Sequence, residues 1–151
     1  MRSRSRKFAL DTNVIIDGLR DSGIGLELEN FYDEFAPFLY LSAVVVHELR
    51  TGARTADLKR IEKHFFAPFE RRGRVFAPTY TTWTRAGDVL RELGEHANTR
   101  VVTRSFACDV LLGLSCREAG VTLVTANTRD FARIADVSPV DFVEPWPGPR
   151  R

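Results

Sequence analysis

The chain has 151 residues, of which 44% are hydrophobic and 28% are charged, and this balance predicts a single globular domain with its own core. No segment has the roughly 20 apolar residues of a membrane span, and no apolar segment of a secretion signal follows the basic start "MRSRSRK". The net charge of +2 is carried by the two ends, so the mildly acidic remainder argues against a protein that binds nucleic acid over its whole surface.

The first half of the chain alternates strand-like and helix-like segments. The hydrophobic pattern predicts strands at 7–10 and 38–42, and helices at 14–20 and 26–35. Ser42 is a natural N-cap for a further helix that ends at Gly52. This alternation is typical of an α/β fold around a parallel sheet.

The second half continues the alternation. The pattern predicts helices at 56–69, at 80–97 and from a Ser105 cap to Gly120, and strands at 74–78, 121–127 and 140–145. The first of these helices is expected to end near Pro68. Trp83, Ala86, Leu90 and Leu93 are spaced to share one face of the helix at 80–97, which we expect to be buried.

No repeat or linker divides the chain, so we expect one domain at 7–145, a disordered basic segment at 1–6 and a loose tail at 146–151. Cys108 and Cys116 are eight residues apart in one helical segment. A helix separates such residues by about 12 Å, which is too far for a disulfide. Free cysteines indicate a reducing compartment, and we expect a cytoplasmic protein.

Polar residues follow three of the predicted strands. Asp11 comes directly after the first strand, Glu48 lies in the helix after the second, and Asn127 and Asp130 follow the strand at 121–127. Ligands of open parallel sheets bind at the carboxyl ends of the strands, so these side chains can line one site.

Asp11 by itself has two interpretations. A carboxylate at this position can cap the following helix, or it can form one wall of an active site. Thr12 or Asn13 can do the capping instead, which would leave Asp11 free for the site.

Asp109 is a second acid that indicates a site. It lies inside "SFACDVLLGLSC", a segment that is apolar almost all round and therefore predicts a buried helix. A buried carboxylate needs a cation, a hydrogen-bond donor or a raised pKa. It can be structural, paired with Arg104 or used as a cap. It can also join Asp11 and Glu48, and two such charges 5 Å apart repel by roughly 3 kcal/mol at an effective dielectric near 20. An oxygen-only cluster of this kind suits Mg²⁺ or Mn²⁺.

Three segments together resemble a known family. "LDTNVIIDG", "LSAVVVHELRTGA" and "ACDVLLGLSCREAGVTLVTANTRDF" are similar, in order and spacing, to the PIN-domain nucleases, above all to the VapC-type toxins of type II toxin–antitoxin pairs. The resemblance covers roughly 7–144. It implies a three-layer α/β/α domain with a central, mainly parallel sheet of about five strands. It also implies a ribonuclease whose cofactor is Mg²⁺ or Mn²⁺.

The resemblance assigns roles by motif position. The acids that it makes both catalytic and metal-binding are Asp11, Glu48, Asp109 and Asp130. The residues that it places in support of them are Thr12, Asn13, Thr125 and Asn127. Both Asn127 and Asp130 match the family's fourth position, which leaves open which of them fills it and whether one or two metal ions are held.

Arginines close to these acids in the sequence are the candidates for binding RNA phosphates: Arg50, Arg104 and Arg129. His47 adjoins Glu48, but neighbouring residues point about 100° apart around a helix, so we interpret His47 as structural.

The leading hypothesis is a toxin ribonuclease that is silenced by a cognate antitoxin and forms a homodimer. One alternative is a PIN-domain nuclease of RNA processing that has no antitoxin. Another is a non-catalytic α/β module with an acidic pocket, such as a phosphoacceptor receiver domain. A receiver domain needs a lysine late in the chain, and the last lysine here is Lys63, which argues against it.

Overall fold

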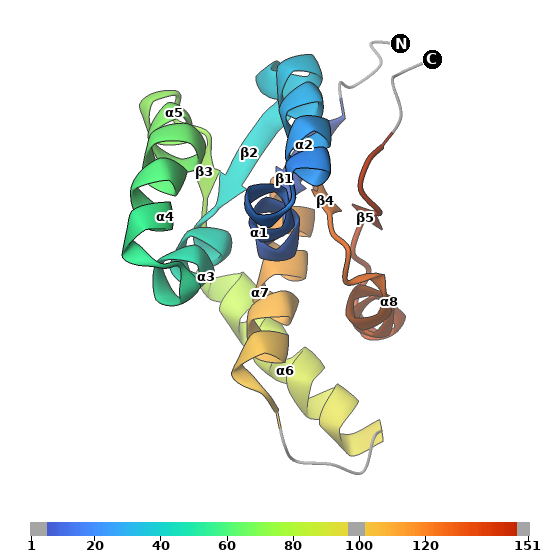
Figure 1. Ribbon diagram of the computed structural model, residues 1–151. Coiled ribbons are helices and arrows are strands. Elements are labelled where there is room, and N and C mark those ends of the chain that lie inside the picture. Colours follow the sequence, from blue (N-terminus) through green and yellow to red (C-terminus); the bar gives the residue numbers. More distant parts are fainter. Residues whose placement is uncertain (1–5, 97–101, 148–151) are drawn as a thin grey trace, which may run out of the picture.

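The computed structural model describes residues 6–96 and 102–147, and its centre is a five-stranded parallel sheet (Figure 1). The strands are β1 (Lys7–Leu10), β2 (Leu39–Ser42), β3 (Val75–Phe76), β4 (Val121–Val124) and β5 (Phe142–Val143). Their order across the sheet is β3-β2-β1-β4-β5, and every neighbouring pair is parallel. The predicted α/β fold with a five-stranded sheet is confirmed.

Helices cover both faces of this sheet. The helices before β3 are α1 (Thr12–Arg20), α2 (Ser22–Phe35), the 3₁₀ turn η1 (Ala36–Phe38), α3 (Ala43–Gly52), α4 (Thr55–Ile61), the π-helical η2 (Glu62–Phe66) and α5 (Ala67–Arg71). The later ones are α6 (Tyr80–His96), α7 (Arg104–Ala119) and α8 (Thr128–Val137). Right-handed crossovers put the first group on one face and the second on the other, where α6, α7 and α8 pack together (Figure 1).

The order of the strands creates a switch point between β1 and β4. The chain runs outward from β1 through β2 to β3, then returns across the sheet to add β4 and β5 on the other side. Leu10 lies beside Val124 in this pair, and the N–H of Asp11 donates to the carbonyl of Val124 at 2.9 Å. The carboxyl ends of β1 and β4 therefore open into one crevice, which is the usual ligand position in such folds.

Ser42 caps α3 as predicted, since its hydroxyl accepts a hydrogen bond from the N–H of Val44 at 3.1 Å. The predicted cap of α7 is wrong. The hydroxyl of Thr103 accepts from the N–H of Phe106 at 3.1 Å, and Ser105 lies inside the first turn. Either residue can cap a helix, and the cap goes to the one in extended backbone just before the first turn.

The predicted buried face of α6 is confirmed in part, because Ala86 is buried and Leu90 and Leu93 pack against the core. The prediction is wrong for Trp83, which is 58% exposed, while Thr82 and Val89 are buried beside Ala86. The buried face is thus turned slightly away from Trp83. The sequence period alone does not fix this edge of the face, because it depends on where α7 and α8 lie.

The helix predicted at 56–69 continues to Arg71 through the π-helical η2. Pro68 does not end it, because it lies at the start of α5, where a missing N–H costs little. At the other end of the chain, Trp146 stacks on Phe31 with ring centroids 5.3 Å apart and donates to Glu27 at 3.0 Å. The packed part of the chain therefore extends to Trp146, the first residue of the predicted loose tail. The predictions for 1–5, 97 and 148–151 lie outside the described residues.

Over the two described ranges, none of the helices combines the length and the apolar character needed to cross a membrane.

Candidate active site

An open hollow with a volume of about 520 Å³ lies at the switch point, and we call it the acidic hollow. Its three buried or half-buried acids come from three separate segments: Asp11 directly precedes α1, Glu48 lies in α3 and Asp109 lies in α7. These are three of the four acids that the sequence places in one site. The fold therefore brings them together from distant parts of the chain.

Asp11 is the most tightly held of the three. Its carboxylate is part of a side chain only 2% exposed, and it accepts three hydrogen bonds. The N–H of Thr12 donates to Oδ1 at 2.7 Å, while the hydroxyl of Thr125 and the amide of Asn13 donate to Oδ2 at 2.7 and 3.2 Å. Asp11 is therefore the N-cap of α1 and a wall of the hollow at once. The expectation that Thr12 or Asn13 caps this helix is wrong.

Thr12 and Asn13 instead tie α1 to its surroundings. The hydroxyl of Thr12 donates a short hydrogen bond to Oε2 of Glu48, which links α1 to α3. The side-chain oxygen of Asn13 accepts from the N–H of Ala126 at 3.3 Å, in the segment after β4. Both residues thus set the positions of the walls of the hollow.

Asn127 joins the other two predicted acids. Its amide Nδ2 donates to Asp109 at 3.3 Å and to Asp130 at 3.1 Å, while its own N–H donates to the hydroxyl of Thr125 at 3.0 Å. Asn127 lines the acidic hollow, whereas Asp130 does not and forms an ion pair with Arg133 at 3.6 Å. Asp130 therefore lies behind Asn127, at the edge of the site.

The surroundings of Asp11 and Asp109 disfavour a negative charge on either carboxyl group. Burial, together with the charges of Asp11, Glu48 and Asp130, raises the pKa of Asp109 to about 8. Burial is also the main cause that raises the pKa of Asp11 to about 6, against the hydrogen bonds from Thr125, Thr12 and Asn13, which lower it. Both carboxyls are thus held at a cost that a cation would remove.

The ligand atoms that the hollow offers are of the type that a hard divalent cation prefers. The hollow offers carboxylate, amide and hydroxyl oxygens, which are the ligands of Mg²⁺ and Mn²⁺. As the side chains are placed, no three or more Asp, Glu, His or Cys residues within 6–96 and 102–147 are grouped closely enough to hold a metal ion. The hydrogen bonds from Thr12 and Asn127 occupy Glu48 and Asp109 in this arrangement.

The three predicted arginines have different surroundings. Arg104 lines the acidic hollow, and its guanidinium lies 3.4 Å from His47 and from the hydroxyl of Thr51. Asp109 is not its partner in the described hydrogen bonds and ion pairs. Arg129 is exposed and outside the lining of the hollow.

Arg50 points away from the site. Its guanidinium pairs with Glu62 at 2.8 Å and lies over the ring of Phe66, 5.1 Å from the ring centre. Its nearness to Glu48 in the sequence is misleading, because successive residues of a helix point in different directions.

Arg20 is a lining residue of the acidic hollow that the sequence interpretation did not select. It lies in the last turn of α1, and Asn13, Ile16 and Asp17 precede it at helical spacing along the same lining. This spacing of seven, four and three residues is the signal that could have found it.

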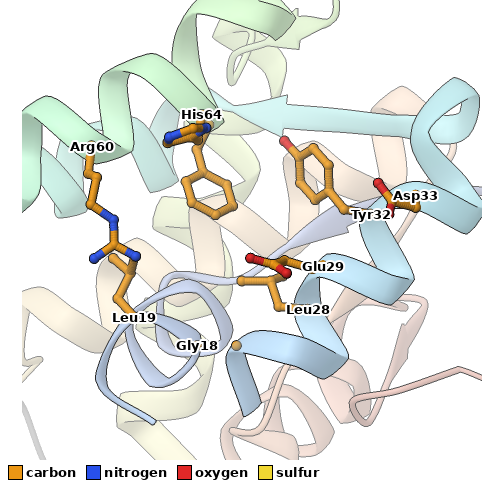
Figure 2. Close-up of a pocket in the computed structure, with 10 residues that line it drawn as sticks. Gly18, Leu19, Leu28, Glu29, Tyr32, Asp33, Arg60 and His64 are labelled. Carbon is orange, nitrogen blue, oxygen red and sulfur yellow. The ribbon is translucent and has the colours of Figure 1, made fainter. Parts of the chain in front are cut away.

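A second hollow lies away from the predicted site residues, between α2 and the α4–η2 segment, and has a volume of about 480 Å³ (Figure 2). One wall carries Glu29 and Asp33, and the other carries Arg60 and His64. Its lining includes none of the acids of the candidate active site, so this second hollow is separate from that site.

The family model of the PIN domain matches residues 8–137. The DNA-bound VapBC complex from Salmonella typhimurium has a chain 19% identical to this one, with a TM-score of 0.70 over 93% of this chain and 98% of that chain. A chain of FitAB bound to an IR36 DNA fragment is 21% identical, with a TM-score of 0.65 over 95% and 98%. A chain of FitAcB from Neisseria gonorrhoeae is 22% identical, with a TM-score of 0.63 over 92% of this chain and 98% of that chain. No curated protein matches the sequence. At these identities the solved structures establish a common fold.

Proposed function

The chain belongs to the PIN domain family, and from this membership we propose that it is a metal-dependent endoribonuclease and the toxin of a toxin–antitoxin pair. Members of the family are nucleases, which makes hydrolysis of a phosphodiester bond the expected reaction. RNA as the substrate and Mg²⁺ or Mn²⁺ as the cofactor are the specific parts of the proposal.

One observation carries it: Asp11, Glu48 and Asp109 come together at the switch point, although burial and nearby negative charges raise the pKa of both Asp11 and Asp109. A purely structural role does not need three acids in one hollow. A site that binds a divalent cation and a phosphate does need them, because the cation offsets the repulsion and the phosphate then has a positive partner.

We assign the metal to Asp11, Glu48 and Asp109. When bound, a divalent ion supplies a lowered pKa for the attacking water and positive charge for the phosphate oxygens. Thr125 and Asn13 hold the carboxylate of Asp11 by direct hydrogen bonds. Loading the site requires Glu48 to exchange its hydrogen bond with Thr12 for the metal.

In this proposal, Asn127 and Asp130 have different roles at the fourth position of the family's acidic site. Asn127 lies in the hollow and donates to Asp109, while Asp130 lies behind it and holds the other side of its amide. Asp130 then acts as a positioning residue for Asn127, or becomes a ligand itself if its side chain leaves Arg133.

An antitoxin is the proposed protein partner, since solved structures of like fold include VapBC and FitAB complexes. The resemblance of the sequence also implies a homodimer, which stays a prediction.

The test is RNA cleavage by the purified chain, with Mg²⁺, Mn²⁺ and EDTA titrated in turn. We expect cleavage with either metal and none in EDTA. Asp11→Asn and Asp109→Asn each remove a carboxylate from the metal and should lower the rate by at least about 100-fold, which corresponds to about 2.7 kcal/mol of transition-state stabilisation.

Asp88→Asn is the matched control, because Asp88 is an exposed acid on α6 that pairs only with Arg91 in the described ion pairs. It should cleave like the parent chain, and circular dichroism should give the same spectrum for all four proteins. Full activity in Asp11→Asn or Asp109→Asn, or cleavage that continues in EDTA, would contradict the proposal.

A further inference from the structure

A third hollow adjoins the acidic hollow and opens between the C-terminal half of α1 and the turn from α3 to α4. We call it the arginine hollow, and its volume is about 500 Å³. The residues that line both hollows are Ile16, Arg20 and Gly52. The two therefore form one continuous depression, with Arg20 at the boundary.

The charge changes sign along this depression. The acidic hollow is lined by Asp11, Asp17, Glu48 and Asp109 against Arg20 and Arg104. The arginine hollow is lined by Arg20 and Arg54 against Asp57 alone. A polyanion that reaches the acids is repelled there unless a cation intervenes, but it is attracted by the adjoining hollow.

The two guanidinium groups of the arginine hollow are available to a ligand. Arg20 has no hydrogen bond or ion pair with another residue in the described part of the chain. Arg54 pairs with Asp57 at 3.0 Å, but the Arg54 side chain is 87% exposed, and exposed pairs of this kind contribute little. A phosphate with two acceptor oxygens can replace Asp57 in a bidentate contact.

The remaining wall is apolar and open. Ile16 and Leu19 line it from α1, and Gly52 and Ala53 face them from the turn. A Cβ atom at Gly52 would lie more than 4 Å from every described atom outside its own helix and its chain neighbours, so the space beside it is open. A base or ribose can lie against such a wall while its phosphates face the arginines.

We propose that the arginine hollow is a subsite for the nucleotide next to the scissile phosphate of a single-stranded RNA. Arg20 binds the phosphate at the boundary of the two hollows, and Arg54 binds the following one. This inference rests on the proposed ribonuclease function. It adds the path that the bound RNA strand takes from the acidic hollow into the arginine hollow. A peptide is the less suitable occupant, since the hollow presents two guanidinium groups and no unpaired acid in its lining.

The test measures binding apart from cleavage. A fluorescein-labelled RNA of 12 nucleotides is titrated with the full chain in EDTA, and its anisotropy is followed at several salt concentrations. Arg20→Ala and Arg54→Ala should each raise the Kd about 5- to 20-fold, and each should lower the slope of log K against log salt by about 1.

Arg91→Ala is the matched control, because Arg91 is also an exposed arginine paired with an aspartate three residues away, at 3.5 Å, but on α6. Its Kd and salt slope should equal those of the parent chain. A loss in Arg91→Ala as large as that in Arg54→Ala would overturn the subsite, and so would unchanged binding in Arg20→Ala and Arg54→Ala.

Cleavage of the same RNA with Mn²⁺ separates the two proposals. If the parent chain cleaves it and the arginine variants bind normally, the subsite is overturned and the ribonuclease stands. If the arginine variants lose affinity but the parent chain cleaves no RNA with either metal, the ribonuclease is overturned and the hollow remains a site for nucleic acid. Loss of affinity in both variants together with cleavage by the parent supports both.

Discussion

Asp109 illustrates how a single residue can oppose stability in order to serve a site. It is 7% exposed, and the amide of Asn127 is its hydrogen-bond donor at 3.3 Å among the described contacts. Its folded pKa of about 8 lies above the ordinary value of 3.8, so the folded chain keeps a proton that the unfolded chain loses. Between these two pH values the folded state binds more protons, and stability falls as the pH rises.

We therefore expect Asp109→Asn to stabilise the metal-free protein at pH 8. One pKa unit corresponds to about 1.4 kcal/mol, and the gain should reach at least that amount, or roughly 3–6 °C in Tm. The difference in Tm from the parent should be much smaller near pH 4, where the Asp109 carboxyl of the parent is protonated in the folded state and partly protonated in the unfolded state. Thermal unfolding in EDTA from pH 4 to 8 measures this. A Tm lowered at every pH, as in a core substitution, would make Asp109 structural.

At the scale of elements, the close packing of α1 on α2 fixes the direction of the helix that carries Asp11, Thr12 and Arg20. A Cβ atom at Gly25 would lie 2.7 Å from the carbonyl oxygen of Gly18, and this contact is with backbone that cannot rotate away. The two helices therefore approach each other at glycine. The site depends on this contact, because α1 supplies one side of both the acidic and the arginine hollow.

A pair of glycine substitutions tests this packing. Gly25→Ala should lower the free energy of unfolding by about 1–3 kcal/mol, because the helices must separate to admit a methyl group. Gly87→Ala in α6 should raise it by about 0.5–1 kcal/mol, since alanine favours the helix and a Cβ there lies more than 4 Å from every described atom outside the helix. Urea unfolding of both variants gives the values. Equal effects of the two substitutions would mean that α1 and α2 are not in close contact.

At the scale of the whole molecule, the strand order decides which residues meet. Asp11 and Asn127 follow β1 and β4, which are neighbours only because the chain returns across the sheet after β3. Glu48 and Asp109 come from helices on opposite faces. A ligand that joins these elements should therefore stabilise the entire fold rather than one segment of it.

Binding of Mn²⁺ should accordingly raise the Tm of the protein. At a concentration 100 times the Kd, mass action contributes about 2.7 kcal/mol, or roughly 5–10 °C for a domain of this size. Differential scanning calorimetry with and without Mn²⁺ measures the shift, with NaCl of equal ionic strength as the control. Asp11→Asn should abolish most of it. A shift of the same size in that variant would place the metal elsewhere.

Much of the architecture could be predicted from local signals. Apolar runs marked β1, β2 and β4, and the extended apolar segment around Asp109 identified α7 as a buried helix with an acid inside it. The exposure of Trp83 on α6 and the cap of α7 could not be predicted, because each has two locally equivalent solutions. Packing against neighbouring elements selects between them.

By itself, the sequence determined the residue types of the site and the elements that carry Asp11, Glu48 and Asp109, since strand ends and buried acids are local features. Only the tertiary structure decided how these residues are used. It gave Asp11 the helix cap as well as a wall of the hollow, put Asn127 between Asp109 and Asp130, turned Arg50 away toward Glu62, and brought Arg20 to the boundary of two hollows. The physical reason is that hydrogen-bond partners and charge neighbours depend on distances between segments far apart in the chain, and these distances exist only once the sheet has formed.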